Sequence, residues 1–93
     1  MQCVYVLQSK PDMKMYIGCT NDLKKRLELH NLGKVSSTQH RRPFKFVYYE
    51  VFADKQDAFR REQWLKTGWG RNRLNKILIN TLRDPTSKKN LSG

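Results

Sequence analysis

The spacing of strand-forming residues is the feature that most constrains the fold of this chain. Residues 3–7 and 15–19 are rich in β-branched and aromatic side chains, and Lys10, Pro11 and Asp12 between them are typical of a turn. The two runs therefore predict a β-hairpin. Residues 44–52, dense in Phe, Val and Tyr, form the strongest strand pattern in the chain.

Helical patterns fill the remaining segments. Capping side chains at residues 20–22 and a glycine at 33 enclose a first helix of about three turns. A polar, basic loop is expected over residues 34–43. A second helix should begin after Asp54 and be broken by Gly68 and Gly70. The third should carry its apolar face on leucines and isoleucines at helical spacing: Leu74, Ile77, Leu78 and Leu82.

These patterns predict an α+β fold in the order ββαβαα, a three-stranded antiparallel sheet flanked by helices. The 93 residues allow one domain, which we place at residues 1–83, followed by a polar, basic tail at 84–93. The start has no basic leader before an apolar run, and no apolar stretch reaches the length of a membrane span. We therefore expect an intracellular, cytoplasmic protein with no membrane segment.

The two cysteines lack the spacing of a zinc site or a disulfide framework. Cys3 and Cys19 are expected to be reduced packing residues. A disulfide between them is the alternative, because pairing of the first two strands would bring them closer.

The charge of the chain indicates a polyanionic partner. Its formal net charge is +11, from 19 Lys and Arg against 8 Asp and Glu. Residues 34–93 carry 14 of the basic and 5 of the acidic side chains. Such an excess favours sequence-independent binding to nucleic acid through counterion release. A ribosome-associated protein, or a merely basic one, remains an alternative.

Three polar side chains stand out against the apolar helix faces. Arg26 and His30 lie one turn apart on the shoulder of the first helix's apolar stripe, from which both can reach the hairpin. They are either a functional pair or ordinary solvated residues. Glu62 interrupts the apolar face of the second helix, where a carboxylate is costly unless paired. It either forms an ion pair with Arg26 or Arg61, or acts as a ligand for Mg²⁺.

The tyrosines of the hairpin are ambiguous by themselves. Tyr5 and Tyr16 on strands can be core residues with their hydroxyl groups at the surface, a role that we assign to Tyr48 and Tyr49. Gly18, next to Tyr16, allows a backbone or ligand to approach closely.

Together these residues resemble the GIY-YIG nuclease superfamily, in particular its small stand-alone members. The motif Tyr16-Ile17-Gly18 is intact, and Cys3-Val4-Tyr5 keeps the tyrosine of the first half-motif. The resemblance covers residues 3 to about 80 and includes Asp22-Leu23-x-x-Arg26, His30-Asn31 and Ala58-x-x-x-Glu62.

The resemblance implies metal-dependent hydrolysis of phosphodiester bonds. Glu62 would hold the metal, Mg²⁺ or Mn²⁺, and Arg26 would stabilise charge on the phosphate. Tyr5 would be the general base, with its phenolate favoured by the metal, Arg26 or His30. Tyr16 would position water or phosphate, and His30 would relay a proton or contact phosphate.

The substrate implied is DNA, and RNA is not excluded. Because the domain is small and has no attached recognition module, we expect it to select a branch, a flap, a nick or a single strand by shape and not by sequence. Trp64 and Trp69 would stack on bases if exposed, but we expect them in the core. Cys3 stands in place of the first half-motif's glycine, so a non-catalytic nucleic-acid-binding protein on the same fold is the alternative. The expected substrate contacts are Gly18 and the basic residues Lys34, Arg41, Arg42, Lys45, Arg71, Arg73 and Lys76.

Overall fold

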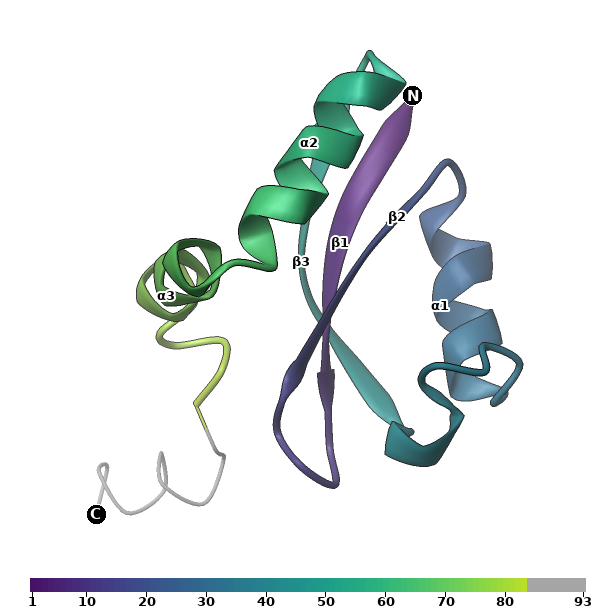
Figure 1. The fold of residues 1–93 in the computed structure, drawn as a ribbon. Coiled ribbons are helices and arrows are strands. Elements are labelled where there is room, and N and C mark those ends of the chain that lie inside the picture. The colour runs from purple at the N-terminus through teal and green to yellow at the C-terminus, as the bar shows by residue number, and fades with distance from the viewer. Residues whose placement is uncertain (84–93) are drawn as a thin grey trace.

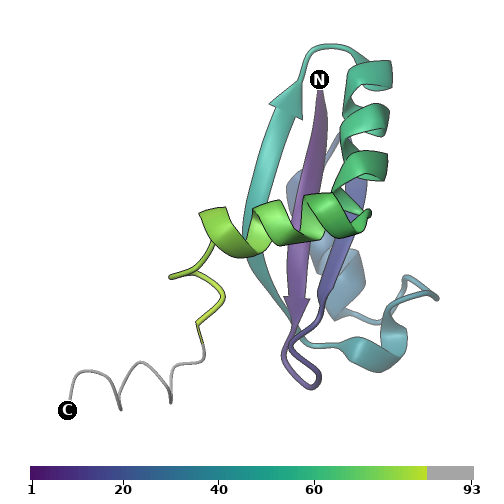
Figure 2. The same ribbon diagram turned by 60° about the vertical axis from the view of Figure 1, so that its left-hand side comes forward.

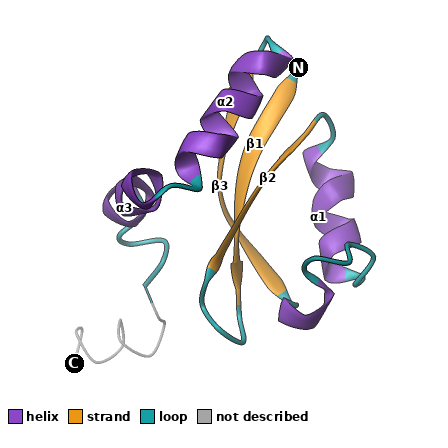
Figure 3. Cartoon of the chain, viewed as in Figure 1, coloured by secondary structure: helices purple, strands orange, loops and turns teal. Residues whose placement is uncertain are grey.

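The structure, a computed structural model, describes residues 1–83 as a three-stranded antiparallel sheet with three α-helices (Figures 1 and 3). The order ββαβαα and the α+β class predicted from the sequence are confirmed. The elements are β1 (Gln2–Ser9), β2 (Met15–Thr20), α1 (Leu23–Asn31), a 3₁₀ turn (Gln39–Arg41), β3 (Phe44–Phe52), α2 (Lys55–Leu65) and α3 (Gly68–Ile77).

Strand β1 is central and is hydrogen-bonded to β2 on one side and β3 on the other. Tyr5 therefore has two partners in register, Gly18 of β2 and Tyr49 of β3. Because successive side chains of a strand point to opposite faces, Val4 and Tyr5 enter different halves of the core. Both are almost fully buried, at 1% exposure each.

The helices cover the sheet unequally (Figures 1 and 2). Helices α2 and α3 lie on one face, and in Figure 2 α3 runs across the strands. Helix α1 lies on the other face beside β2. The α2–α3 face buries Val4, Val6, Ile17, Val47, Ala58, Leu65, Leu74 and Leu78, and the α1 face buries Tyr5, Leu7 and Phe44 against Tyr16, Leu23 and Leu27.

The predicted helix starts are confirmed by their caps. The Asp22 carboxylate accepts the Lys25 N–H at 3.1 Å at the start of α1. The Asp54 carboxylate accepts the Gln56 N–H at 2.7 Å at the start of α2. After α1, Gly33 takes a φ of +75°, a conformation in which glycine avoids a side-chain clash.

The boundary between α2 and α3 differs from the prediction. Gly70 lies in the first turn of α3 instead of separating two helices, and the helix ends at Ile77 before reaching Leu82. The Thr67 hydroxyl oxygen accepts the Gly70 N–H at 3.2 Å and so begins the helix. A Cβ on residue 70 would collide with the backbone of Trp64, so glycine here permits close packing of α3 on the end of α2.

The expectation that both tryptophans are core residues is wrong. Trp69 is 79% exposed, because the inward face of α3 is set by Gly70 and Leu74, one turn apart. Trp64 is 39% exposed, and its ring lies 4.9 Å from the guanidinium carbon of Arg61.

The two tyrosines of β3 also differ from one another. Tyr48 is half-buried and donates its hydroxyl proton to Glu50 at 2.6 Å, as expected of a core tyrosine with a polar contact at its tip. Tyr49 is 51% exposed, which contradicts the core role assigned to it. Its side of the sheet is the α1 face, where Phe44 at the start of β3 is buried against α1, but Tyr49 further along the strand is not covered.

Cys3 and Cys19 are both free. Cys19 lies opposite Val4, and Cys3 lies opposite Thr20, so the two side chains point to opposite faces of the sheet. None of the helices within residues 1–83 is long and apolar enough to cross a membrane. The basic tail predicted at 84–93 lies outside the described residues.

Candidate active site

The hairpin brings Tyr5 directly over Gly18. The two residues are register partners, and a Cβ built on Gly18 would lie 2.5 Å from the Tyr5 hydroxyl oxygen. The missing side chain therefore makes room for the Tyr5 ring. The sequence had indicated a close approach at Gly18, expected to be that of a substrate; the group that approaches is Tyr5 itself.

A chain of hydrogen bonds connects Tyr5 to helix α1 and to the loop beyond it. The Arg26 Nε–H group donates to the Tyr5 hydroxyl oxygen at 3.4 Å. That hydroxyl lies 2.8 Å from His30 Nε2, and His30 Nδ1 lies 2.9 Å from the Thr38 hydroxyl. The Thr38 hydroxyl donates to the Val35 carbonyl oxygen at 3.3 Å. His30 and Thr38 are fully buried, at 0% exposure.

The direction of this chain fixes the protonation of its members. Because Thr38 donates its only hydroxyl proton to the Val35 carbonyl oxygen, its own oxygen accepts a hydrogen bond from His30 Nδ1–H. His30 Nε2 is then unprotonated and accepts the hydroxyl proton of Tyr5. These hydrogen bonds therefore form a continuous chain from Arg26 through Tyr5 and His30 to Thr38, which we call the relay. A proton acceptor, His30 Nε2, is buried at its centre.

The pKa values of the relay agree with this assignment. Burial, helped by the charge of Arg26, lowers the pKa of His30 to about 4, so the imidazole is neutral at pH 7. Burial raises the pKa of Tyr5 to about 12, against the opposing hydrogen bond from Arg26. Of the three groups expected to favour a Tyr5 phenolate, the metal, Arg26 or His30, this neutral imidazole is the one that supplies no positive charge.

Tyr16 completes an aromatic cluster around the imidazole. Its ring centroid lies 4.9 Å from that of His30 in an edge contact and 6.2 Å from that of Tyr5. The Phe44 ring closes the cluster at 5.8 Å from His30. Tyr16 itself is only partly buried. It therefore forms the more accessible wall of the relay.

Arg26 faces a small hollow at the end of strand β2. The hollow is lined by Arg26, Lys25 and Leu29 of α1 and by the turn at residues 20–22. The hydrogen bond to Tyr5 raises the pKa of Arg26 above its ordinary value, so the guanidinium stays charged. Two basic side chains therefore line an opening beside the buried relay.

Glu62 lies across the sheet from this relay, on the inner side of α2. Its side chain is 13% exposed and forms an ion pair with Lys66 at 2.7 Å. The predicted alternatives, pairing with Arg26 or Arg61, are wrong: Arg61 donates two hydrogen bonds to Glu50, at 2.9 and 3.0 Å. The signal for Lys66 was present in the sequence, since Glu and Lys four residues apart pair along a helix.

The end of β2 connects the two faces of the sheet. Burial raises the pKa of the Cys19 thiol, and the negative charge of Glu62 raises it further. A second hollow on this side is lined by Cys19, Thr20, Asn21 and residues of α2. The Arg26 hollow on the other side shares Thr20 and Asn21. Because β2 is an edge strand, a ligand at its end can contact both faces.

A divalent metal at Glu62 would depend on ligands from outside the chain. Within residues 1–83 no three His, Cys, Asp or Glu side chains lie close enough together to hold a metal ion. One carboxylate suits Mg²⁺, which keeps several waters and often completes its coordination with substrate phosphate. The donor set at Glu62 fits this mode, provided that the Lys66 ammonium moves away.

The basic residues expected to bind substrate do not all line one cavity. Arg41 and Arg71 line a cavity at the opposite end of the hairpin from Arg26. Lys45 donates to the Thr81 carbonyl oxygen, and the Arg42 guanidinium packs against Gly33. The remaining three, Lys34, Arg73 and Lys76, are not buried.

Thr38 is the site residue that the sequence did not reveal. It lies in the polar loop between α1 and β3, among serines, where nothing marks one hydroxyl as buried. Only the return of this loop beneath α1 brings Thr38 to His30. A hydrogen bond of this kind depends on tertiary structure, so local sequence carries no signal for it.

Comparisons of this chain with family models and with known proteins agree with one another. Residues 1–75 match the model of the GIY-YIG catalytic domain. UPF0213 protein CPE1444 of Clostridium perfringens is 34% identical over 93 residues, which cover 99% of each chain. A UPF0213 protein of Bacillus pumilus is 46% identical over 70 residues, or 74% of this chain and 69% of that one.

A solved structure supports the fold directly. The solution NMR structure of the UPF0213 protein BH0048 from Bacillus halodurans superposes with a TM-score of 0.53. The two chains are 32% identical, and the match covers 83% of this chain and 85% of that one.

Proposed function

This chain belongs to the GIY-YIG family, in its small single-domain UPF0213 group, and from this premise we propose that it is a divalent-metal-dependent endonuclease acting on DNA. The observation that carries the proposal is the relay from Arg26 through Tyr5 to His30. A charged guanidinium and a neutral, buried proton acceptor are both connected to one tyrosine hydroxyl. Phosphodiester hydrolysis needs both functions.

The base in this proposal is the tyrosine–histidine pair. As water attacks the phosphorus atom, one of its protons passes to the Tyr5 oxygen. The hydroxyl proton of Tyr5 passes at the same time to His30 Nε2. No free phenolate is formed, so the tyrosine pKa of about 12 does not set the cost of this step. The cost is set by the His30 pKa of about 4, because burial and Arg26 disfavour the imidazolium. The imidazolium so formed keeps its Nδ1–H bond to Thr38. After the bond to the leaving oxygen breaks, its Nε2 proton returns through Tyr5 to solvent, and the leaving oxygen takes up a proton from solvent.

Arg26 stabilises the negative charge that grows on the phosphate during the reaction. Its Nε–H is engaged by Tyr5, so its terminal N–H groups remain for the phosphate oxygens. Tyr16, beside the imidazole and partly exposed, orients the attacking water. Glu62 would hold the divalent cation together with a substrate phosphate oxygen. A bound cation supplies a Lewis acid that offsets charge on the leaving oxygen.

The same fold also supports a second candidate function, nucleic-acid binding without efficient cleavage. The observation that favours it is the ion pair of Glu62 with Lys66, which already neutralises the only carboxylate proposed for the metal. The net charge of +11 would suffice for binding in either case. RNA is a possible ligand on both proposals, since backbone contacts alone do not distinguish it from DNA.

Cleavage assays separate the two candidates. Branched, flapped, single-stranded and linear duplex DNA are incubated with the protein in Mg²⁺, in Mn²⁺ and in EDTA. The nuclease proposal predicts metal-dependent cleavage, with branched or flapped DNA cut fastest. It also predicts a loss of about 100-fold or more in Arg26→Ala. Lys24→Ala, an exposed cation on the same helix, is the matched control and should cleave normally.

Either of two results would reject the nuclease proposal. The first is salt-sensitive binding of every substrate with no cleavage of any, which selects the binding protein. The second is cleavage that persists unchanged in Arg26→Ala, which shows that another site or another protein is responsible.

A further inference from the structure

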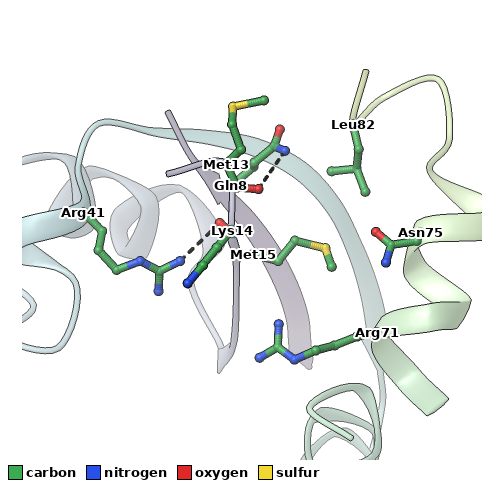
Figure 4. A pocket seen from close by; sticks show the side chains of 8 residues that line it. All are labelled: Gln8, Met13, Lys14, Met15, Arg41, Arg71, Asn75 and Leu82. Carbon is green, nitrogen blue, oxygen red and sulfur yellow. Dashed lines mark hydrogen bonds between the residues drawn. The ribbon is translucent and has the colours of Figure 1, made fainter. Parts of the chain in front are cut away.

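A second basic site lies at the other end of the hairpin. A cavity of about 720 Å³ opens between the hairpin turn, the 3₁₀ turn and α3 (Figure 4). It is lined by Gln8, Met13, Lys14, Met15, Arg41, Arg71, Asn75 and Leu82. No acidic side chain is among these lining residues, and three of them are cations.

The cations come from three separate parts of the chain and converge on one space. Lys14 belongs to the hairpin, Arg41 to the 3₁₀ turn and Arg71 to the first turns of α3. In Figure 4 Arg71 and Asn75 project from α3 toward the hairpin, and Arg41 approaches Lys14 from the opposite side. Arg71 and Asn75 are four residues apart, so both face the cavity.

Arg41 is held firmly in place. Its Nε–H donates to the Asp12 carboxylate at 3.2 Å, and its terminal amino group donates to the Lys14 carbonyl oxygen at 3.2 Å. Its own carbonyl oxygen accepts the hydroxyl proton of buried Ser9 at 2.6 Å. These contacts fix one wall of the cavity before any ligand binds. They therefore lower the conformational entropy that the Arg41 side chain loses on binding.

Lys14 and Arg71, by contrast, keep their charges available. The ion pairs found within residues 1–83 involve Arg41, Arg61 and Lys66 and leave these two cations out. Cations that converge without acidic partners repel one another, and an anion between them removes that repulsion. An arginine beside a lysine and an amide is a suitable donor set for phosphate oxygens.

A neighbouring hollow extends the positive charge around the hairpin turn. It shares Gln8 and Met13 with the first cavity and adds Lys10, Lys45 and Arg83 to the lining. This hollow also has no acidic lining residue. The two together form a basic end of the sheet that is wider than one phosphate group, which favours a polyanion over a single small anion.

The position of the cavity relates it to the proposed active site. Met15 lines the cavity, and Thr20, which lines the Arg26 hollow, lies five residues further along β2. At about 3.3 Å per residue the separation along β2 is about 17 Å. The cavity lies on the α3 face and the Arg26 hollow on the α1 face, so the bound backbone would pass the edge strand β2. A duplex advances about 3.4 Å per base pair, so about five nucleotides span this separation.

We propose that this cavity is a second phosphate-binding site, which holds the nucleic-acid backbone about five nucleotides from the bond that is cleaved. The identity of the ligand as nucleic acid rests on the proposed function. The site's contribution is affinity and register along the strand, since neither Lys14 nor Arg71 reaches the relay.

Binding measurements at several salt concentrations test this proposal. Fluorescence anisotropy with labelled flapped DNA compares the wild type with Lys14→Ala, Arg71→Ala and the double variant. Arg60→Ala, an exposed arginine on α2 outside the cavity, is the control for general loss of charge. The double variant should bind about tenfold more weakly, and the slope of log K against log salt should fall by about 0.9 for each phosphate that it no longer neutralises. Arg60→Ala should be weakened much less.

Cleavage at saturating DNA supplies a second readout. The rate at saturation should be unchanged in the double variant while KM rises, because the cavity does not touch the reacting atoms. Shortening the DNA on one side of the cleavage point to fewer than about five nucleotides should reduce the wild-type affinity to that of the double variant.

The outcomes distinguish failure of the second-site proposal from failure of the nuclease proposal. If the wild type binds and cleaves DNA but the double variant is no weaker than Arg60→Ala, the second site is disproved and the nuclease proposal survives. If the cavity variants weaken binding as predicted but no metal-dependent cleavage occurs, the site stands and the nuclease proposal fails. Equal competition by inorganic phosphate and by DNA at equal phosphate concentration would show a small-anion site and overturn the proposal.

Discussion

The Tyr5 ring lies across Gly18, its partner on the neighbouring strand, and occupies the space that a side chain on residue 18 would need. The same ring carries the hydroxyl group that joins Arg26 to His30. A glycine of the second half-motif and a tyrosine of the first are thus parts of one packing arrangement, and the position of the relay depends on both.

Adding one methyl group at this position should displace the relay. In Gly18→Ala the new Cβ would lie within 2.5 Å of the Tyr5 hydroxyl oxygen, so the ring must move. We expect a loss of about 1–3 kcal/mol in the free energy of unfolding, measured by urea denaturation, together with loss of cleavage. Gly68→Ala is the control, since nothing lies within 4 Å of a Cβ there. Equal effects of the two variants would show that Tyr5 is not held by this contact.

The strands and caps followed from local sequence, whereas the orientation of the aromatic residues did not. Residues 44–52 and the caps at Asp22 and Asp54 appear in the structure as expected, because alternation and capping are local signals. The exposure of Trp69 depends on how α3 packs against the end of α2 through Gly70. That contact is between two helices, and a single-helix pattern does not contain it.

The candidate site was predictable only where local spacing determines it, and not where it depends on contacts between separate elements. Tyr5, Arg26 and His30 were expected near one another from their spacing, and the structure brings them together. The state of His30 was not predictable, because its neutrality comes from complete burial and from Thr38, a residue of the following loop. The Lys66 partner of Glu62 followed from helical spacing but was not expected.

The buried histidine should make stability depend on pH. The pKa of His30 falls to about 4 in the folded chain from an ordinary value of 6.5, so the unfolded chain binds the extra proton between these values. Folding stability should therefore decrease as the pH falls from about 6.5 toward 4, by up to about 3 kcal/mol. Urea denaturation across this range measures it. His40→Ala, which alters an exposed histidine, should keep the dependence. A free energy of unfolding that does not change between pH 6.5 and 5 would contradict the burial of a neutral imidazole.

Removing the Tyr5 hydroxyl should affect both stability and activity. Tyr5→Phe leaves His30 Nε2 without its donor in a buried place, at a cost of about 1–3 kcal/mol in the free energy of unfolding. Cleavage at saturating DNA should fall about 10²- to 10⁴-fold while DNA affinity changes little. Tyr49→Phe, on the exposed part of β3, should leave both quantities unchanged. Normal cleavage by folded Tyr5→Phe would remove Tyr5 from the base assignment.

The exposed tryptophan should contribute little to folding. Trp69→Ala should change the free energy of unfolding by less than about 0.5 kcal/mol, because the side chain is 79% exposed. Leu74→Ala on the inward face of the same helix should cost about 2–5 kcal/mol, because that leucine is fully buried. Thermal or urea denaturation compares the two. Similar losses in both variants would mean that Trp69 is packed in solution.

Single-turnover cleavage of one flapped DNA in Mg²⁺ by the wild type and by Glu62→Gln tests the central claim most directly. The amide keeps the size of the side chain but removes the charge proposed to hold the metal. Glu28→Gln, which neutralises an exposed carboxylate on α1, is the matched control. The nuclease proposal predicts metal-dependent cleavage by the wild type and by Glu28→Gln, and a rate at least about 100-fold lower in Glu62→Gln. Equal rates in all three proteins, or a wild-type rate unaffected by EDTA, would contradict it.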